Sequence, residues 1–239
     1  MATLDQWAYN FRNIARAGAG NSDDDTLGIR QIKFWIQGYR AVGIEQKTNY
    51  GKDINPQLVS DFGILELQEI DQSDTVNCQG IEWGCKIMKV VIPNLVDLPK
   101  NRALLFIGKI DKQTNFQKDD ANTHEFVSET RFGHLITRYF IVGTTVYIGL
   151  SKKDEGMKYV NGRGVVEDPT QLKWIEENEE GECVEVCFDD AVHQYPLTMN
   201  LFEFISTNIM QKELGMTLQT VESLLNNARN EIQTSEPQG

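Results

Sequence analysis

The spacing of apolar residues changes twice along the chain, and this change constrains the fold more than any other feature. Up to about residue 56, large apolar residues recur at helical intervals, as in "LDQWAYNFRNIA" and "IRQIKFWIQGYRA". Residues 57–192 instead hold short runs rich in Val, Ile and aromatic residues, separated by Gly, Asn, Asp or Pro. Helical spacing then returns. We therefore predict an α+β protein with an N-terminal helical hairpin (1–56), a mostly antiparallel β region (57–192), and C-terminal helices (193–239) that pack on the hairpin and complete a helical bundle.

Residues with capping preferences mark the ends of the first two expected helices. Thr3 comes directly before the first helical run and Gln6 follows three positions later, which predicts a capping box. The range Ser22–Asp25 supplies caps and negative charges that suit a helix N-terminus. We therefore expect a second helix from this range to near Asn49.

The later elements follow from the same signals. About five to seven strands are expected in the β region, with a loop at the proline-containing "VIPNLVDLPKNR". Asp168 and Pro169 in "DPTQLKWIEE" favour the start of a helix. Two further helices are expected, one in "YPLTMNLFEFISTNIMQKELG" and a last one over residues 217–233.

The charge balance limits the classes of partner. The chain of 239 residues has 23 Lys and Arg against 35 Asp and Glu, a net charge of −12. Nonspecific attraction to nucleic acid or to an anionic membrane is not expected over most of the surface, so any DNA contact would need a local basic patch. The start is unlike a signal peptide and no run of about 18 apolar residues occurs, which predicts a protein that is neither exported nor membrane-spanning.

Two pairs of cysteines are the first candidates for a metal site, Cys78 with Cys85 and Cys183 with Cys187. If "ECVEVCF" is a strand, the α-carbons of Cys183 and Cys187 lie roughly 13 Å apart, too far to share one zinc ion. The zinc alternative needs a turn in this segment, which has no Gly or Pro inside it. We interpret the four cysteines as reduced, buried structural thiols.

No other pattern predicts catalysis or a cofactor. The acidic run "EENEEGE" lacks the spacing of a calcium loop, and "GRGVVEDP" lacks the third glycine of a phosphate-binding loop. The histidines lie far apart and outside ligand or triad motifs: His124, His134 and His193. We predict no catalytic residue, no metal site and no cofactor; an enzyme with an unrecognised site is the alternative.

The stretch "QIKFWIQGYRAVGIEQ" combines many large apolar residues with cations. At about 100° per residue, one row is expected to face the core and consists of Ile32, Trp35, Ile36, Tyr39 and Val42. Beside it runs a polar band of Arg30, Lys33, Gln37, Arg40 and Lys47, and then a second apolar row of Phe34 and Ala41. The second row either lies between two neighbours in its own fold or is exposed for another chain. The band is a solvated face, an ion-pairing surface or a contact to DNA phosphates.

Several segments, in a fixed order, resemble one protein family. They are "IRQIKFWIQGYRA", "INPQLVSDFGILELQEID", "WGCKIMKVVIPNLVDLPKNRALLFIGKIDKQTNF", "YIGL", "GRGVVEDPTQL" and "YPLTMNLFEFISTNIMQKELG". Together they are similar to the head-to-tail connector proteins, adaptors or rings, of crAss-like and related Bacteroidetes phages. The resemblance covers most of the chain, and its motifs are specific in their order but carry no catalytic chemistry.

This resemblance implies a virion structural protein of the phage tail and not an enzyme. It implies a homo-oligomeric ring of twelve copies between the portal protein and the tail, in contact with further tail or ring proteins and made in the host cytoplasm. DNA would pass through the lumen without specific binding, in agreement with the acidic balance, and no membrane would be involved. The alternative from another class is a nucleic-acid-binding regulator that uses the N-terminal helices. The long connection over residues 18–25 disfavours its helix-turn-helix form.

In such a ring each copy meets the next through two different patches. The second apolar row and its neighbouring cations are the expected subunit interface, namely Arg30, Phe34, Arg40 and Ala41. The apolar stripe of the last helix is the expected portal-docking surface, namely Leu218, Val221, Leu225 and Ile232. Both assignments are hypotheses from the geometry of exposed rows and from family analogy.

Overall fold

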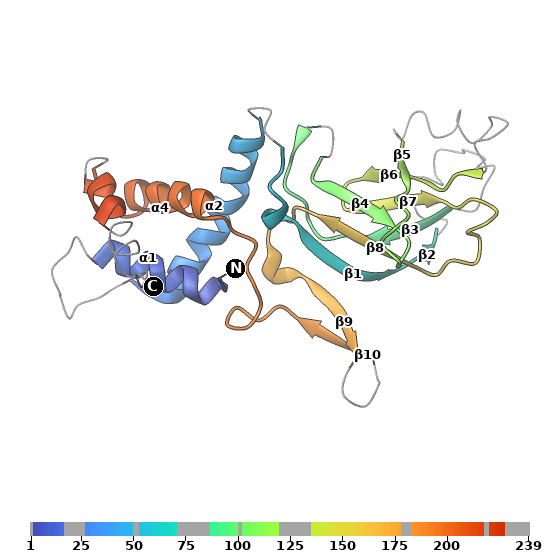
Figure 1. Cartoon of the computed structure of the whole chain (residues 1–239), viewed down its shortest axis with the longest axis horizontal. Coiled ribbons are helices and arrows are strands. Elements are labelled where there is room, and N and C mark those ends of the chain that lie inside the picture. The colour runs from blue at the N-terminus through green and yellow to red at the C-terminus, as the bar shows by residue number, and fades with distance from the viewer. Residues whose placement is uncertain are drawn as a thin grey trace, which may run out of the picture.

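The computed structural model describes residues 2–16, 27–49, 53–70, 87–99, 102–119, 135–177, 183–217 and 220–227 of the chain. The helices lie together at one end of the molecule and most strands at the other, and a two-stranded hairpin extends from the region between them (Figure 1). We call the two ends the helical body and the β body. The chain is an α+β protein, as the change in apolar spacing predicted.

The helical body contains α1 (Leu4–Arg16), α2 (Ile29–Asn49) and α4 (Met199–Lys212), and residues 220–227 are also helical. The predicted capping box is present before α1, because the Thr3 N–H donates to Gln6 Oε1 at 3.0 Å and the Gln6 N–H donates to Thr3 Oγ1 at 3.3 Å. Helix α2 ends as predicted. It begins later than predicted, since Leu27 and Gly28 are not helical; the expected start at residues 22–25 lies outside the described residues.

Helices α1 and α4 both pack on α2, and buried side chains fill the space between them. The rings of Trp7 on α1 and Phe202 on α4 lie with their centroids 4.6 Å apart. Further members of this core are Leu4, Phe11, Ile32, Ile36, Ile44, Leu201, Ile205 and Ile209. Each such side chain contributes about 1.5–3 kcal/mol when it is fully buried, so this core holds the helices together.

The β body consists of two sheets. The smaller has the strand order β1 (Ser60–Glu66), β8 (Tyr159–Gly164), β4 (Leu104–Gly108), all antiparallel. The larger has the order β2 (Gln68–Glu69), β3 (Ile87–Val91), β7 (Thr145–Gly149), β6 (Arg138–Val142), β5 (Gln117–Lys118), in which only β5 and β6 are parallel. Side chains of both sheets meet in a second core that includes Phe62, Val90, Ile107, Val146 and Val160. This agrees with the mostly antiparallel region that the sequence predicted.

A two-stranded antiparallel hairpin, β9 (Lys173–Glu177) with β10 (Cys183–Cys187), forms a small sheet of its own, in which β9 contacts β1 (Figure 1). The strand prediction for "ECVEVCF" is confirmed, and the helix prediction for "DPTQLKWIEE" is wrong. Asp168 does cap a helical turn, with its Oδ1 accepting from the Thr170 N–H at 3.0 Å. That turn is only the 3₁₀ helix η5 (Pro169–Gln171), and a strand follows it. An Asp-Pro start suits a single turn as well as a long helix, and pairing with β10 decides what comes next.

Candidate functional site

The buried face of α2 differs from the predicted core row. Ile32 and Ile36 are fully buried, as predicted, and Trp35 and Tyr39 are half-buried. Val42 is 42% exposed, so its assignment to the core is wrong. The buried row instead continues at four-residue spacing through Arg40 and beyond it to Ile44 and Thr48.

Arg40 is fully buried, and its predicted place on an exposed subunit interface is therefore wrong. Its Nε donates to the carbonyl oxygen of Pro196 at 2.9 Å, its Nη1 to that of Val166 at 2.6 Å, and its Nη2 to that of Leu58 at 3.3 Å. The guanidinium carbon also lies 5.7 Å from the centre of the Tyr195 ring. Burial lowers the pKa of Arg40, but the ordinary value is so high that the group stays charged. Arg40 thus joins the helical body to the β body.

Lys33 is the second cation of the predicted band that is engaged within the subunit. Its Nζ lies 2.5 Å from Asp5 Oδ1 and 2.8 Å from Asp190 Oδ2. Burial acts to lower the pKa of Lys33, but the hydrogen bonds to the two carboxylates outweigh it and raise the pKa. Lys47 donates to the carbonyl oxygen of Asn200 at 2.7 Å. The band is therefore mainly engaged within the subunit, Lys33 in ion pairs and both Arg40 and Lys47 with backbone carbonyl groups, whereas Arg30 is exposed.

Phe34 is 68% exposed, as expected for the second apolar row, and Ala41 is half-buried on the same side of α2. Together they line a hollow of about 350 Å³ between α2 and the edge of the β body. We call this surface the Phe34 face; it consists of Phe34, Gln37, Gly38, Ala41, Pro93, Asn94, Glu167, Asp168 and Gln171. The structure thus brings Phe34 and Ala41 together and separates both from the guanidinium of Arg40.

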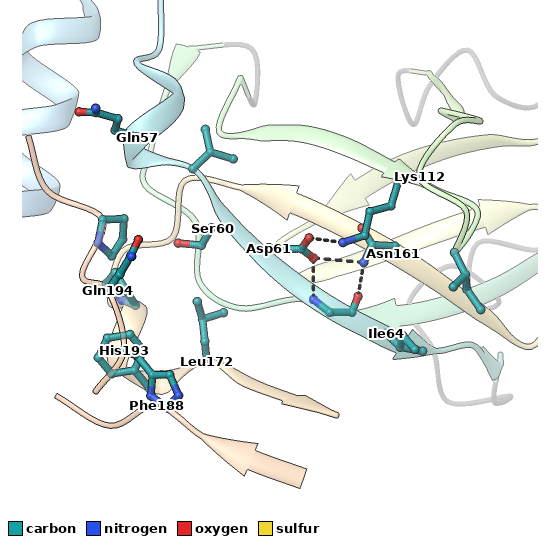
Figure 2. Close-up of a pocket in the computed structure, with 15 residues that line it drawn as sticks. Gln57, Ser60, Asp61, Ile64, Lys112, Asn161, Leu172, Phe188, His193 and Gln194 are labelled. Carbon is teal, nitrogen blue, oxygen red and sulfur yellow. Dashed lines mark hydrogen bonds and ion pairs between the residues drawn. The ribbon is translucent and has the colours of Figure 1, made fainter. Parts of the chain in front are cut away.

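A second hollow, of about 650 Å³, runs along β1 toward the base of the β9–β10 hairpin (Figure 2). We call it the Asp61 groove. Its lining includes the apolar side chains of Val59, Ile64, Ile110, Pro169, Leu172, Phe188 and Pro196, and the polar ones of Gln57, Ser60, Asp61, Lys112, Asn161, His193 and Gln194. Sequence reasoning missed this site, because its residues come from five separate segments of the chain.

Asp61 organises the polar end of the groove (Figure 2). Its Oδ1 accepts from the Gly63 N–H at 2.9 Å and from Asn161 Nδ2 at 3.1 Å, and its Oδ2 lies 2.6 Å from Lys112 Nζ. Arg163 Nε is 3.4 Å from the same oxygen. Burial acts to raise the pKa of Asp61, but the bonds from Lys112, Gly63 and Asn161 outweigh it and lower the pKa. The Asp-x-Gly spacing in "SDFG" was the one sequence signal for this arrangement, since Gly63 has φ +71° at an irregularity in β1.

The predicted portal-docking residues are placed differently from the expectation. Val221 is fully buried, and Leu225 is half-buried against the core of the helical body. Leu218 and Ile232 lie outside the described residues. Val221 is thus unavailable to a partner in this fold, because its stripe at helical spacing packs on the chain's own helices.

Those candidate metal ligands that fall in the described ranges do not form a metal site. His193 accepts at Nδ1 from the Asp189 N–H at 2.7 Å, while His124 and His134 lie outside the described residues. Cys187 is a free, exposed thiol, so its prediction as buried is wrong; Cys78 and Cys85 also lie outside the described residues. Within the part of the chain that the structure describes, no three His, Cys, Asp or Glu could hold a metal ion together. In the same ranges no helix has the length and apolar character to cross a membrane.

Exposed apolar side chains, two hollows and charged rims make up a surface of the kind through which proteins assemble with one another. The comparison with known families agrees. The sequence matches the family described as phage tail ring protein 2, of crAss-like phages, over residues 11–232, and the chain belongs to this family. No curated protein gives a significant match. The protein is therefore a structural component of the virion that builds a ring in the phage tail, as the resemblance implied.

Proposed function

We propose that the ring built by this protein lies between the portal and the tail and joins the head to the tail. The observation that carries this proposal is the family match over residues 11–232, which spans both the helical body and the β body. A ring at this position would contact the portal on one side and further tail or ring proteins on the other. We propose twelve copies, assembled after synthesis in the host cytoplasm.

The hydrogen bonds of Arg40 between the two bodies support a structural role in the tail. Its guanidinium reaches carbonyl oxygens from the turn before β1, from the residues after β8 and from the segment before α4. A buried charged group with several hydrogen bonds strongly disfavours separation of the parts it joins. The two bodies are therefore held in a fixed relative position, which a subunit needs in order to keep its place in a ring.

The overall charge supports a lumen through which DNA passes without specific binding. A net charge of −12 repels phosphates on average, and the cations Lys33 and Arg40 are engaged inside the subunit. The same observation weighs against a DNA-binding regulator built on the N-terminal helices. Titration of the purified chain with duplex DNA at falling salt concentration separates the two, because a regulator would bind more tightly as salt falls.

The proposed subunit interface consists of Arg30, Phe34 and Ala41, without Arg40. Phe34 is the largest exposed apolar side chain on α2, and burial of such a side chain contributes about 1.5–3 kcal/mol. Portal docking by Val221 and Leu225 is not proposed further, because both pack on the chain's own core.

Electron microscopy of intact particles tests the proposal. Particles labelled through a tag on this chain should show the label in a ring next to the portal, and the purified chain mixed with its portal should form a complex. A label at the distal tip of the tail would contradict the proposed position. A chain that neither self-associates nor binds the portal would contradict the proposed role.

A further inference from the structure

We propose that successive copies in the ring contact each other head to tail, with the Phe34 face of one copy seated in the Asp61 groove of the next. This inference rests on the proposed ring and names the two patches that build it. A ring needs two different, complementary patches on each chain, because a patch that pairs with itself closes into a dimer.

The turn η5 places the two hollows on different sides of the same element. Asp168 and Gln171 line the Phe34 face, whereas Pro169 and Leu172 line the Asp61 groove. A 3₁₀ helix has about three residues per turn, so residues three apart share a side and the two pairs point in directions about 120° apart. Both hollows are therefore available on one subunit at the same time, as a head-to-tail contact requires.

The Phe34 face presents an exposed aromatic side chain, and the Asp61 groove presents an apolar recess that can receive it. Phe34 projects from α2 with 68% of its surface exposed. The Asp61 groove is a recess, and its apolar rim includes Ile110, 46% exposed, and Ile64, 39% exposed. A single protruding aromatic ring and an apolar recess of about 650 Å³ form the kind of anchor and pocket that dominate protein interfaces.

The charges of the two surfaces also complement each other. The Phe34 face is lined by the carboxylates of Glu167 and Asp168, and Arg30 lies one turn before Phe34. In the lining of the groove, Lys112 and Asp61 balance each other, and Arg163, which reaches the carboxylate of Asp61 from outside the lining, adds one positive charge at the edge of the groove. The Phe34 face thus carries an excess of negative charge and the edge of the groove an excess of positive charge, which favours their contact over contact between two Phe34 faces.

Cross-linking in purified particles tests the contact. The double variant Phe34→Cys with Ile110→Cys is made in a Cys187→Ser background, because Cys187 is exposed, and is treated with a short bifunctional maleimide. We expect a ladder of covalent multimers on a denaturing gel, and no ladder from either single variant. The matched control pairs Phe34→Cys with Val192→Cys, since Val192 is 69% exposed but lies outside the groove lining, and should give no ladder.

Three results would overturn the inference. The first is no ladder from the double variant in particles that contain the ring, and the second is a ladder from Phe34→Cys alone, which would mean that Phe34 meets itself. The third comes from mixing purified Phe34→Glu and Ile110→Glu copies. Each keeps one intact patch, so the mixture should form a complex of two copies and stop; monomers only, where the unaltered chain assembles, would count against the contact. The position of the ring, measured by electron microscopy, is a separate result. It tests the proposed function and does not test this contact between copies.

Discussion

Arg40 Nη1 lies 2.6 Å from the carbonyl oxygen of Val166, and this hydrogen bond joins the middle of α2 to the residues that follow β8. A cation in the fully buried row of a helix is uncommon unless its donors are satisfied. Here the acceptors are backbone carbonyl groups from three segments, all of which need a donor once they are buried. The buried guanidinium of Arg40 therefore needs these carbonyl groups as acceptors. The junction between the helical body and the β body in turn needs Arg40 as a donor.

Replacement of Arg40 should destabilise the whole subunit. In Arg40→Leu the buried carbonyl oxygens lose their donors, and we expect the free energy of unfolding to fall by roughly 3 kcal/mol or more. Denaturant titration followed by circular dichroism measures the change. Arg30→Leu removes an exposed cation from the same helix and should change the free energy by no more than about 0.5 kcal/mol. Equal stability of the two variants would contradict the structural role of Arg40.

Phe34 should matter for assembly and not for folding. We expect Phe34→Glu to unfold within about 0.5 kcal/mol of the unaltered chain, since the side chain is exposed, and to be absent from the ring in particles. Gln46→Glu adds the same charge at an exposed position of α2 and should be incorporated normally. Quantitative mass spectrometry of purified particles compares the two. Normal incorporation of Phe34→Glu would show that Phe34 is not part of the subunit interface.

The stabilising effect of Asp61 should depend on pH in the acid range. Because its pKa is lowered on folding, the carboxylate contributes stability that is complete above its unfolded pKa, about 3.9, and is lost as pH falls through the folded pKa. Asp61→Asn keeps an acceptor for the Gly63 N–H but has no charge. We expect the variant to be less stable than the unaltered chain at neutral pH, and the difference in free energy of unfolding to shrink as the solution is made more acidic. A difference that is the same at every pH would show that the charge of Asp61 contributes nothing.

Two glycines of α2 should respond to alanine in opposite ways. A Cβ at Gly38 would meet nothing within 4 Å, so Gly38→Ala should raise the free energy of unfolding by about 0.5–1 kcal/mol through helix propensity. A Cβ at Gly43 would lie 2.6 Å from Leu201 Cδ1 and 2.9 Å from Phe204 Cδ1. We expect overpacking to make Gly43→Ala less stable than Gly38→Ala by about 1–3 kcal/mol. Thermal unfolding of both variants checks the order, and the reverse order would contradict the close approach of α4 to α2.

The sequence was sufficient for the features that depend on neighbouring residues. The capping box at Thr3 and Gln6 is a contact over three positions, and the helical spacing of Trp7, Ile32 and Ile36 marks the core of the helical body directly. The exposure of Phe34 also follows from its angular position on α2. The family resemblance came from the order of segments along most of the chain, which is a property of sequence alone.

The features that the sequence did not predict depend on residues far apart in the chain. The sequence predicts a surface position for Arg40, because the carbonyl groups that accept its hydrogen bonds are 18 to 156 positions away and come close only in the folded chain. The Asp61 groove is likewise hidden, since Lys112 and Asn161 lie 51 and 100 positions from Asp61. The strand after Pro169 was missed because pairing with β10, and not local preference, decides its conformation.

The three residues of η5 influence the relative orientation of two larger surfaces, the Phe34 face and the Asp61 groove. If the Phe34 face and the Asp61 groove build the ring, their orientation relative to each other sets the rotation from one copy to the next, and a full circle divided by that rotation gives the number of copies. The turn is held at one end by the carboxylate of Asp168 and lies next to the carbonyl groups that Arg40 fixes. The conformation of η5 would then determine the diameter of the tail at this level. An insertion in η5 would change the width of the central channel and leave the cores of the helical body and the β body intact.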